Sequence, residues 1–68
     1  MQLKKPLSDR EKQVLKLVAD GFSNKIVSVK LKISEYTVDK HNRMILEKLE
    51  ATNMKHAVAM GIREGEIE

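Results

Sequence analysis

Short apolar stripes with helical spacing, each following a residue suited to cap a helix, constrain this fold more than any other feature. Residues 8–11 (Ser-Asp-Arg-Glu) have the form of a capping box, in which the serine and glutamate side chains each accept a hydrogen bond from a free backbone N–H. The apolar stripe that follows consists of Val14, Leu15, Val18 and Ala19. Gly21 then supplies a residue that can adopt the left-handed conformation ending a helix. The pattern predicts a helix that begins after Ser8.

Three further helices are predicted along the chain. They cover residues 24–31 behind Ser23 or Asn24, residues 35–49 behind Ser34, and about 54–64 behind Asn53. Because no segment alternates apolar and polar residues, no strand is predicted. The second and third helices are separated by a tight turn at Lys32 and Ile33, and such a pair after a supporting helix is typical of a helix-turn-helix. We therefore predict an all-α, four-helix bundle containing a helix-turn-helix.

The length of 68 residues predicts one domain, with a small helical core and no deep enclosed pocket. We assign residues 7–65 to that domain, residues 1–6 to a flexible segment or linker end, and residues 66–68 to a frayed tail. Since the chain has no cysteine, disulfides and thiolate metal sites are excluded. No apolar run approaches the roughly 20 residues that cross a bilayer, so no membrane partner is predicted.

Positive charge is concentrated in the first half of the chain. The formal net charge is +3, with a pI of about 9.3; residues 1–34 carry +5 and residues 35–68 carry −2. This asymmetry suggests a polyanionic partner, and ordinary surface lysines are the alternative.

The third predicted helix has two different faces. At about 100° per residue, one face collects Val38, Asn42, Ile45 and Leu49. The opposite face collects Tyr36, Lys40, Arg43, Met44 and Glu47, with Asp39 at its border. A helix fits the major groove of DNA, where Arg and Lys donate to guanine, so this face is a candidate for base contacts. A simply solvated, charge-rich face is the alternative.

An enzymatic role is not predicted. His41 and His56 share no helical turn with each other, and no cluster of acidic residues joins them, so neither a metal site nor a cofactor is predicted. Ser8, Ser23 and Ser34 serve better as caps than as nucleophiles. His41 is expected to be a packed histidine, with a phosphate contact as the alternative.

The sequence resembles the LuxR/FixJ-type helix-turn-helix domains over residues 7–63. The resemblance rests on residues 7–11 (LSDRE), 14–15 (VL), 19–25 (ADGFSNK), 33–35 (ISE), 37–38 (TV), His41, 45–46 (IL) and 48–49 (KL). It implies a cytoplasmic DNA-binding domain that is the output module of a bacterial transcription regulator of the response-regulator or quorum-sensing type. Its partners would be double-stranded DNA, a second copy on DNA, an N-terminal receiver or sensor domain, and RNA polymerase.

The resemblance and the groove geometry together assign roles to particular positions. Base contacts are expected from Tyr36, Asp39, Lys40 and Arg43. Phosphate contacts are expected from Lys25, Ser34, Thr37 and Lys48. The dimer contact on DNA is expected from Lys55, Ala59 and Met60 in the fourth helix.

Some positions depart from the family pattern. Asp39 stands where many relatives carry Lys or Arg; it could orient Arg43, accept from cytosine, or occupy a neutral rim. Glu50 replaces the usual glycine, so either the backbone there is left-handed or the helix continues. Ile26 and Val29 replace charged residues and are either incidental surface aliphatics or a docking spot.

Overall fold

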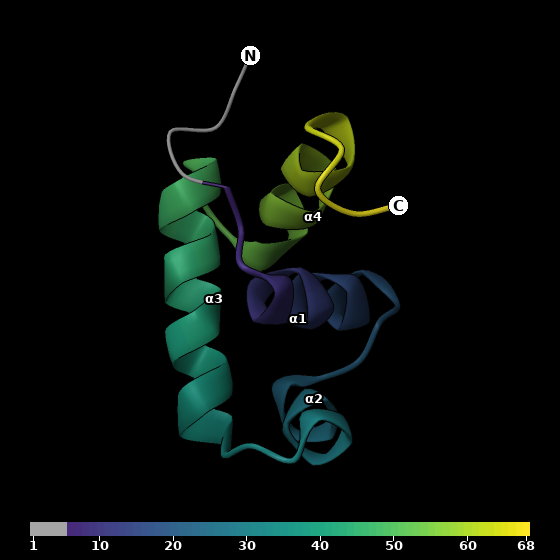
Figure 1. Cartoon of the computed structure of the whole chain (residues 1–68), viewed down its shortest axis with the longest axis vertical. Helices are drawn as coiled ribbons and strands as arrows, with labels where there is room; N and C mark the ends of the chain where they lie inside the picture. The colour runs from purple at the N-terminus through teal and green to yellow at the C-terminus, as the bar shows by residue number, and fades with distance from the viewer. Residues whose placement is uncertain (1–5) are drawn as a thin grey trace.

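The computed structural model describes residues 6–68, which contain four α-helices and no strand (Figure 1). The helices are α1 (Asp9–Ala19), α2 (Asn24–Leu31), α3 (Glu35–Leu49) and α4 (Met54–Arg63). The predicted all-α class and the four predicted helices are therefore confirmed. The flexible segment predicted for residues 1–6 falls, apart from Pro6, outside the described residues.

The four helices pack around α3, the longest of them. In Figure 1, α3 runs along one side of the molecule, α1 crosses beside its middle, α2 lies near its N-terminal end and α4 near its C-terminal end. Helix α3 contacts each of the other three helices, and α1 does the same, whereas α2 and α4 do not touch. The two ends of α3 are thus supported by different helices.

Each helix begins where its capping side chain accepts a backbone N–H. The donor and cap pairs are Glu11 N to Ser8 Oγ at 3.1 Å, Ile26 N to Ser23 Oγ at 3.3 Å, Thr37 N to Ser34 Oγ at 3.0 Å, and His56 N to Asn53 Oδ1 at 2.8 Å. Ser23, not Asn24, is therefore the cap of α2, and this leaves the Asn24 side chain available for another contact. The capping box predicted at residues 8–11 is complete, since Ser8 N donates to Glu11 Oε1 at 2.8 Å.

Left-handed residues end α2 and α3. Lys32 has φ of 57° and Glu50 has φ of 52°, and these are the positive-φ residues other than glycine among residues 6–68. Glu50 therefore follows the first alternative, in which α3 stops and the chain turns. Gly21, with φ of 95°, occupies the left-handed position predicted after α1.

The core is a single apolar cluster. It consists of Leu7, Val14, Leu15, Val27, Val38, Ile45, Leu49, Ala57 and Ile67. The predicted inner face of α3 is confirmed, because Val38 and Ile45 are completely buried and Asn42 is buried beside them. Gly61 lets α4 approach α1 closely, since a Cβ on Gly61 would lie 2.7 Å from Leu15 Cδ2.

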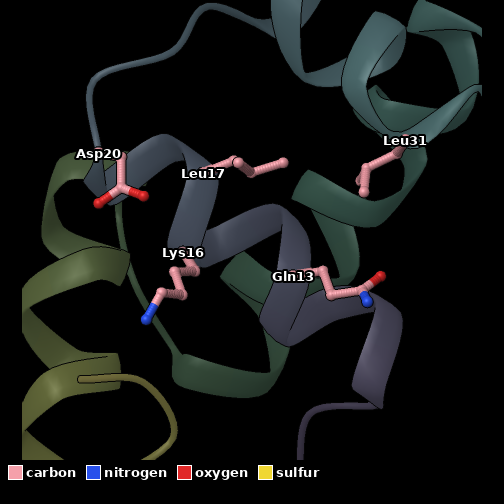
Figure 2. A pocket seen from close by; sticks show the side chains of 5 residues that line it. All are labelled: Gln13, Lys16, Leu17, Asp20 and Leu31. Atoms are coloured by element: carbon pink, nitrogen blue, oxygen red, sulfur yellow. The ribbon is translucent and has the colours of Figure 1, made fainter.

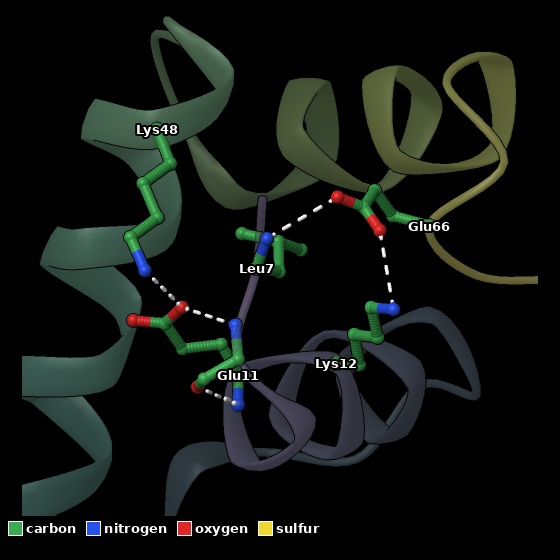
Figure 3. A network of polar contacts seen from close by, with 6 residues as sticks. Leu7, Glu11, Lys12, Lys48 and Glu66 are labelled. Atoms are coloured by element: carbon green, nitrogen blue, oxygen red, sulfur yellow. Dashed lines mark hydrogen bonds and ion pairs between the residues drawn. The ribbon is translucent and has the colours of Figure 1, made fainter. Parts of the chain in front are cut away.

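In residues 66–68, for which a frayed tail is predicted, Glu66 and Ile67 contact the rest of the domain. Gly65, with φ of 75°, turns the chain back, and Glu66 N donates to Gly61 O at 2.8 Å. Ile67 returns to the core, where it is 7% exposed. Glu66 Oε1 accepts from Leu7 N at 3.2 Å and Glu66 Oε2 lies 3.4 Å from Lys12 Nζ (Figure 3). Glu66 thus contacts residues near the start of the domain, which are distant from it in the sequence.

Lys32→Gly should stabilise the domain by about 1 kcal/mol, because glycine removes the Cβ crowding of a left-handed residue. Glu50→Gly should act in the same direction. Thermal unfolding followed by circular dichroism measures the effect. Gly21→Ala is the control of opposite sign and should lower the unfolding temperature; a fall with Lys32→Gly would contradict the argument.

Candidate nucleic-acid interface

The outer face of α3 is not covered by the rest of the domain. In Figure 1 the other three helices lie on one side of α3, and its opposite side is open. Tyr36 is 71% exposed and Met44 is 41% exposed, and Lys40 and Arg43 are also exposed. Val38, Ile45 and Leu49 hold the helix from behind. The structure therefore brings Tyr36, Lys40 and Arg43 together on one accessible surface.

Lys40 is partly positioned by its neighbour in the preceding turn. Its Nζ lies 5.7 Å from the centre of the Tyr36 ring, within the range of a cation–π contact. Such a contact at an exposed site contributes about 0.5–1 kcal/mol. The tyrosine thus directs the ammonium along the outer face while both groups stay accessible.

The predicted phosphate residues Ser34 and Thr37 lie at the start of α3. Their hydroxyls are 2.9 Å apart, and Ser34 Oγ also caps the helix. The positive end of the helix dipole and the free N–H groups of the first turn favour an anion at this place. Lys25 is exposed in the first turn of α2, the helix that packs against α3.

Asp39 makes a contact that none of the sequence alternatives included. Its Oδ1 accepts from Asn24 Nδ2 at 2.9 Å, and Asn24 Oδ1 in turn accepts from Asn42 Nδ2 at 3.1 Å. No ion pair joins Asp39 to Arg43 within residues 6–68, so the orienting role suggested for Asp39 is not what the structure shows. Asn24 and Asn42 were missed as site residues. The available signal was a polar residue, Asn42, within the apolar stripe of α3.

Lys48 does not lie with the other predicted phosphate residues. Its Nζ is 2.7 Å from Glu11 Oε1, and the two side chains are 15% and 6% exposed (Figure 3). Lys48 therefore points toward α1 and joins the capping box to α3. The phosphate contact predicted for Lys48 stays a prediction, and it would have to compete with this contact to a buried carboxylate.

The buried pair alters the pKa of Glu11. Burial raises the pKa of this carboxyl, but the hydrogen bonds from Lys48 and from the Ser8 backbone, together with the positive charge of Lys48, outweigh burial. The net effect holds the pKa below the ordinary value of 4.5. Glu11 is thus an ionised group that stabilises the folded state at neutral pH.

The predicted dimer residues lie on α4, away from the start of α3. Lys55 and Ala59 are exposed and Met60 is half-buried, and Ile62 nearby is 54% exposed. His56 Nδ1 accepts from Thr52 N at 3.1 Å, so this histidine serves the turn before α4. His41 is half-buried, in line with the expectation of a packed side chain.

One surface hollow, of about 230 Å³, lies between α1 and α2 (Figure 2). It is lined by Gln13, Lys16, Leu17, Asp20 and Leu31. Leu17 extends into the space between the two helices, and Lys16 and Asp20 lie at another side of the hollow. With no histidine and a single carboxylate, this lining does not form a recognisable acid–base pair.

No group of three or more potential metal-ligating side chains comes together in residues 6–68. In the same range, no helix is both long and apolar enough to span a membrane.

Comparison with known proteins places this geometry in a family. Residues 5–61 match the family of bacterial regulatory proteins described as the luxR family. The transcriptional regulatory protein DesR of Bacillus subtilis is 47% identical over 60 residues, and FixJ of Rhizobium meliloti is 39% identical over 59 residues. The matches cover 88% and 87% of this chain but only 30% and 29% of those proteins. The chain therefore spans less than a third of the length of these relatives.

Solved structures agree with the sequence comparison. The transcription factor GerE superimposes with a TM-score of 0.89 at 32% identity, over 96% of this chain and 97% of that one. The response regulator ChrA of a heme-sensing two-component system superimposes with a TM-score of 0.87 at 34% identity, over 91% of this chain and 31% of that one.

Glu11→Gln should lower the free energy of unfolding by about 2 kcal/mol near neutral pH, because it removes the charge that Lys48 pairs with. The folded-state pKa of Glu11 is depressed, so this stabilisation is present above the ordinary value of 4.5 and is lost as the pH falls below it. The difference between variant and wild type should therefore disappear in acid. Urea unfolding at about pH 7 and about pH 3 measures it.

Lys12→Ala is the matched control, since it breaks the more exposed pair with Glu66 and should cost less than about 1 kcal/mol. An equal loss for Glu11→Gln at both pH values would show that the charge of Glu11 is not what stabilises the fold.

Proposed function

Since this chain belongs to the LuxR family of bacterial regulatory proteins, we propose that it binds double-stranded DNA with α3 in the major groove. In this proposal it is the DNA-binding output domain of a bacterial transcription regulator. The observation that carries the proposal is the one-sided packing of α3, which leaves Tyr36, Lys40 and Arg43 accessible on a helix whose back is buried. A helix fits the dimensions of the groove, and this one presents the donors of Lys40 and Arg43 outward beside the carboxylates of Asp39 and Glu47.

The first two turns of α3 carry the proposed base contacts. Arg43 and Lys40 supply donors for guanine O6 and N7. Tyr36 adds a hydroxyl and a ring that directs Lys40. Asp39, at the side of this face nearest α2, adds an acceptor. Base discrimination therefore rests on a mixed set of donors and one acceptor.

The proposed phosphate contacts lie around the proposed base contacts, and Lys48 is not among them. Lys25 provides a charge from α2, and Ser34 and Thr37 mark the N-terminal end of α3, where backbone N–H groups and the helix dipole favour an anion. These contacts fix the position of the helix on the duplex and carry no sequence information of their own.

Pairing of two copies is proposed to take place on DNA, through Lys55, Ala59 and Met60 of α4. Two symmetry-related copies of Lys55 would repel one another across a two-fold contact. The neighbouring half-sites on DNA would supply the proximity that offsets this repulsion. A receiver domain, as in the response-regulator relatives, and RNA polymerase are the further proposed partners of the regulator as a whole.

A second function is favoured by the outer face of α2. Ile26 is 41% exposed and Val29 is 67% exposed, so α2 offers an apolar spot for a protein partner. A protein-interaction module of this kind would need no affinity for DNA. Anisotropy titration with mixed duplexes at moderate salt separates the two functions, since the alternative predicts no binding.

Lys25→Ala should weaken binding to all duplexes by a similar factor and reduce the log–log salt slope by about 0.9, because one phosphate contact is lost. Anisotropy titrations at several salt concentrations measure the slope. Lys16→Ala removes the same charge from the α1–α2 hollow and should leave the slope unchanged.

Lys48→Ala should destabilise the fold without changing the salt slope. A change in the slope with this variant would show that Lys48 contacts a phosphate.

Arg43→Ala should instead reduce discrimination at one base position by about 1–3 kcal/mol. Competition with duplexes carrying each base pair in turn measures the effect. A uniform loss on every sequence would assign Arg43 to the phosphate backbone.

Without DNA, the domain should be monomeric at micromolar concentration because of the repulsion between the two copies of Lys55. Sedimentation velocity with and without a duplex holding two half-sites tests this. A tight dimer in the absence of DNA would contradict it.

A further inference from the structure

Three polar side chains form a chain of hydrogen bonds between α2 and α3, here called the amide relay (Asn42, Asn24 and Asp39). It begins at Asn42, which is 8% exposed, and passes through half-buried Asn24 to exposed Asp39. The links are 3.1 Å from Asn42 Nδ2 to Asn24 Oδ1 and 2.9 Å from Asn24 Nδ2 to Asp39 Oδ1. The relay thus connects the core to the outer surface at the first two turns of α3.

The direction of the relay is set by Asp39. An ionised carboxylate only accepts, so the Asn24 amide must turn its NH₂ group toward Asp39. The Asn24 oxygen then faces Asn42, which must also present its NH₂ group. Turning over either amide would place two oxygens or two NH₂ groups against each other. The order of donors and acceptors therefore follows from the charge at the surface end.

This arrangement is unfavourable for stability at its buried end. Asn42 Oδ1 is buried without a hydrogen-bond partner. A buried acceptor without a partner costs free energy, and the position lies in the apolar stripe beside Val38 and Ile45. An apolar side chain of similar size would fill the place without that cost. Packing alone does not account for an asparagine here.

What the relay does achieve is to hold the Asp39 carboxylate in place. One oxygen accepts from Asn24, whose own oxygen is held in turn by the buried Asn42 amide. The other oxygen belongs to an exposed side chain adjacent to Lys40 and one turn before Arg43. A carboxylate is repelled by phosphate, so among DNA groups it can pair only with a donor on a base edge.

We propose that the amide relay positions Asp39 to accept a hydrogen bond from the exocyclic amino group of cytosine, and so makes this domain select cytosine at one place in its site. The proposal rests on the proposed DNA-binding function and adds its specificity. In the major groove, cytosine presents the N4 amino donor alone, whereas adenine presents its N6 donor beside the N7 acceptor, which repels a carboxylate. Asp39 is the contacting residue, and Asn24 and Asn42 are positioning residues.

The experiment first selects bound duplexes from a random pool with the wild-type domain, and then measures relative affinity for the four base pairs at each position. Asp39→Asn should move the preference at one position from cytosine to adenine, because an amide pairs with adenine N6 and N7. Asn42→Leu should raise the unfolding temperature and leave the salt slope unchanged. It should also reduce the cytosine preference at that same position by about threefold to tenfold, as expected for a weakened single base contact.

Asp20→Asn makes the same chemical change as Asp39→Asn but in the α1–α2 hollow, and should alter none of these quantities. The combination of a higher unfolding temperature with lower discrimination separates positioning from a structural role. If Asn42→Leu lowers stability and weakens binding equally on every sequence, the relay is structural and the proposal is overturned. The same conclusion follows if Asp39→Asn leaves every base preference unchanged.

Failure of the underlying function gives a different result. If the wild-type domain enriches no sequence and binds no duplex at moderate salt, the proposed DNA-binding function fails, and the specificity proposal fails with it. If the wild-type domain binds selectively but no cytosine preference responds to position 39, only the specificity proposal is overturned.

Discussion

The one-sided packing of α3 is the constraint on which the other features of this domain depend. Val38, Ile45 and Leu49 anchor the helix against α1, α2 and α4, so the helix cannot roll without exposing them. The buried pair of Lys48 and Glu11 adds a charged contact to the same side. Because the back of α3 is fixed in this way, the direction of the Cα–Cβ bond at every position on its outer face is fixed as well.

The sequence predicted the features that arise from local interactions. Capping serines, a left-handed glycine and apolar spacing act within a few residues, and they located the four helices and the inner face of α3. Contacts between residues that are distant in the sequence were not predicted. The positive charge of Lys48 suits a phosphate contact. Its contact with Glu11, which is 37 residues away in the sequence, becomes visible only in the folded structure. Ile67 was expected to fray because the sequence likewise does not reveal its contact with the core.

In the candidate site too, features within one helix were predicted and contacts between helices were not. Tyr36, Lys40 and Arg43 follow from helical geometry on one element, and they are accessible as expected. The contact of Asp39 with Asn24 joins two helices, and its partner depends on Ser23 being the cap of α2. Asn42 was visible as a polar residue in an apolar stripe, but its meaning required knowledge of what lay opposite. Asn42 departs from the apolar pattern of its helix face at the place where it contacts Asn24 of another helix.

The hydrogen bond from Leu7 N to Glu66 Oε1 joins the beginning and the end of the domain on the side of the bundle where α4 lies (Figure 1). A polypeptide joined before residue 6 would leave the domain at this end, far from the start of α3. In the proposed function, a neighbouring domain joined through this end would therefore lie away from the first two turns of α3 and would leave Tyr36, Lys40 and Arg43 accessible.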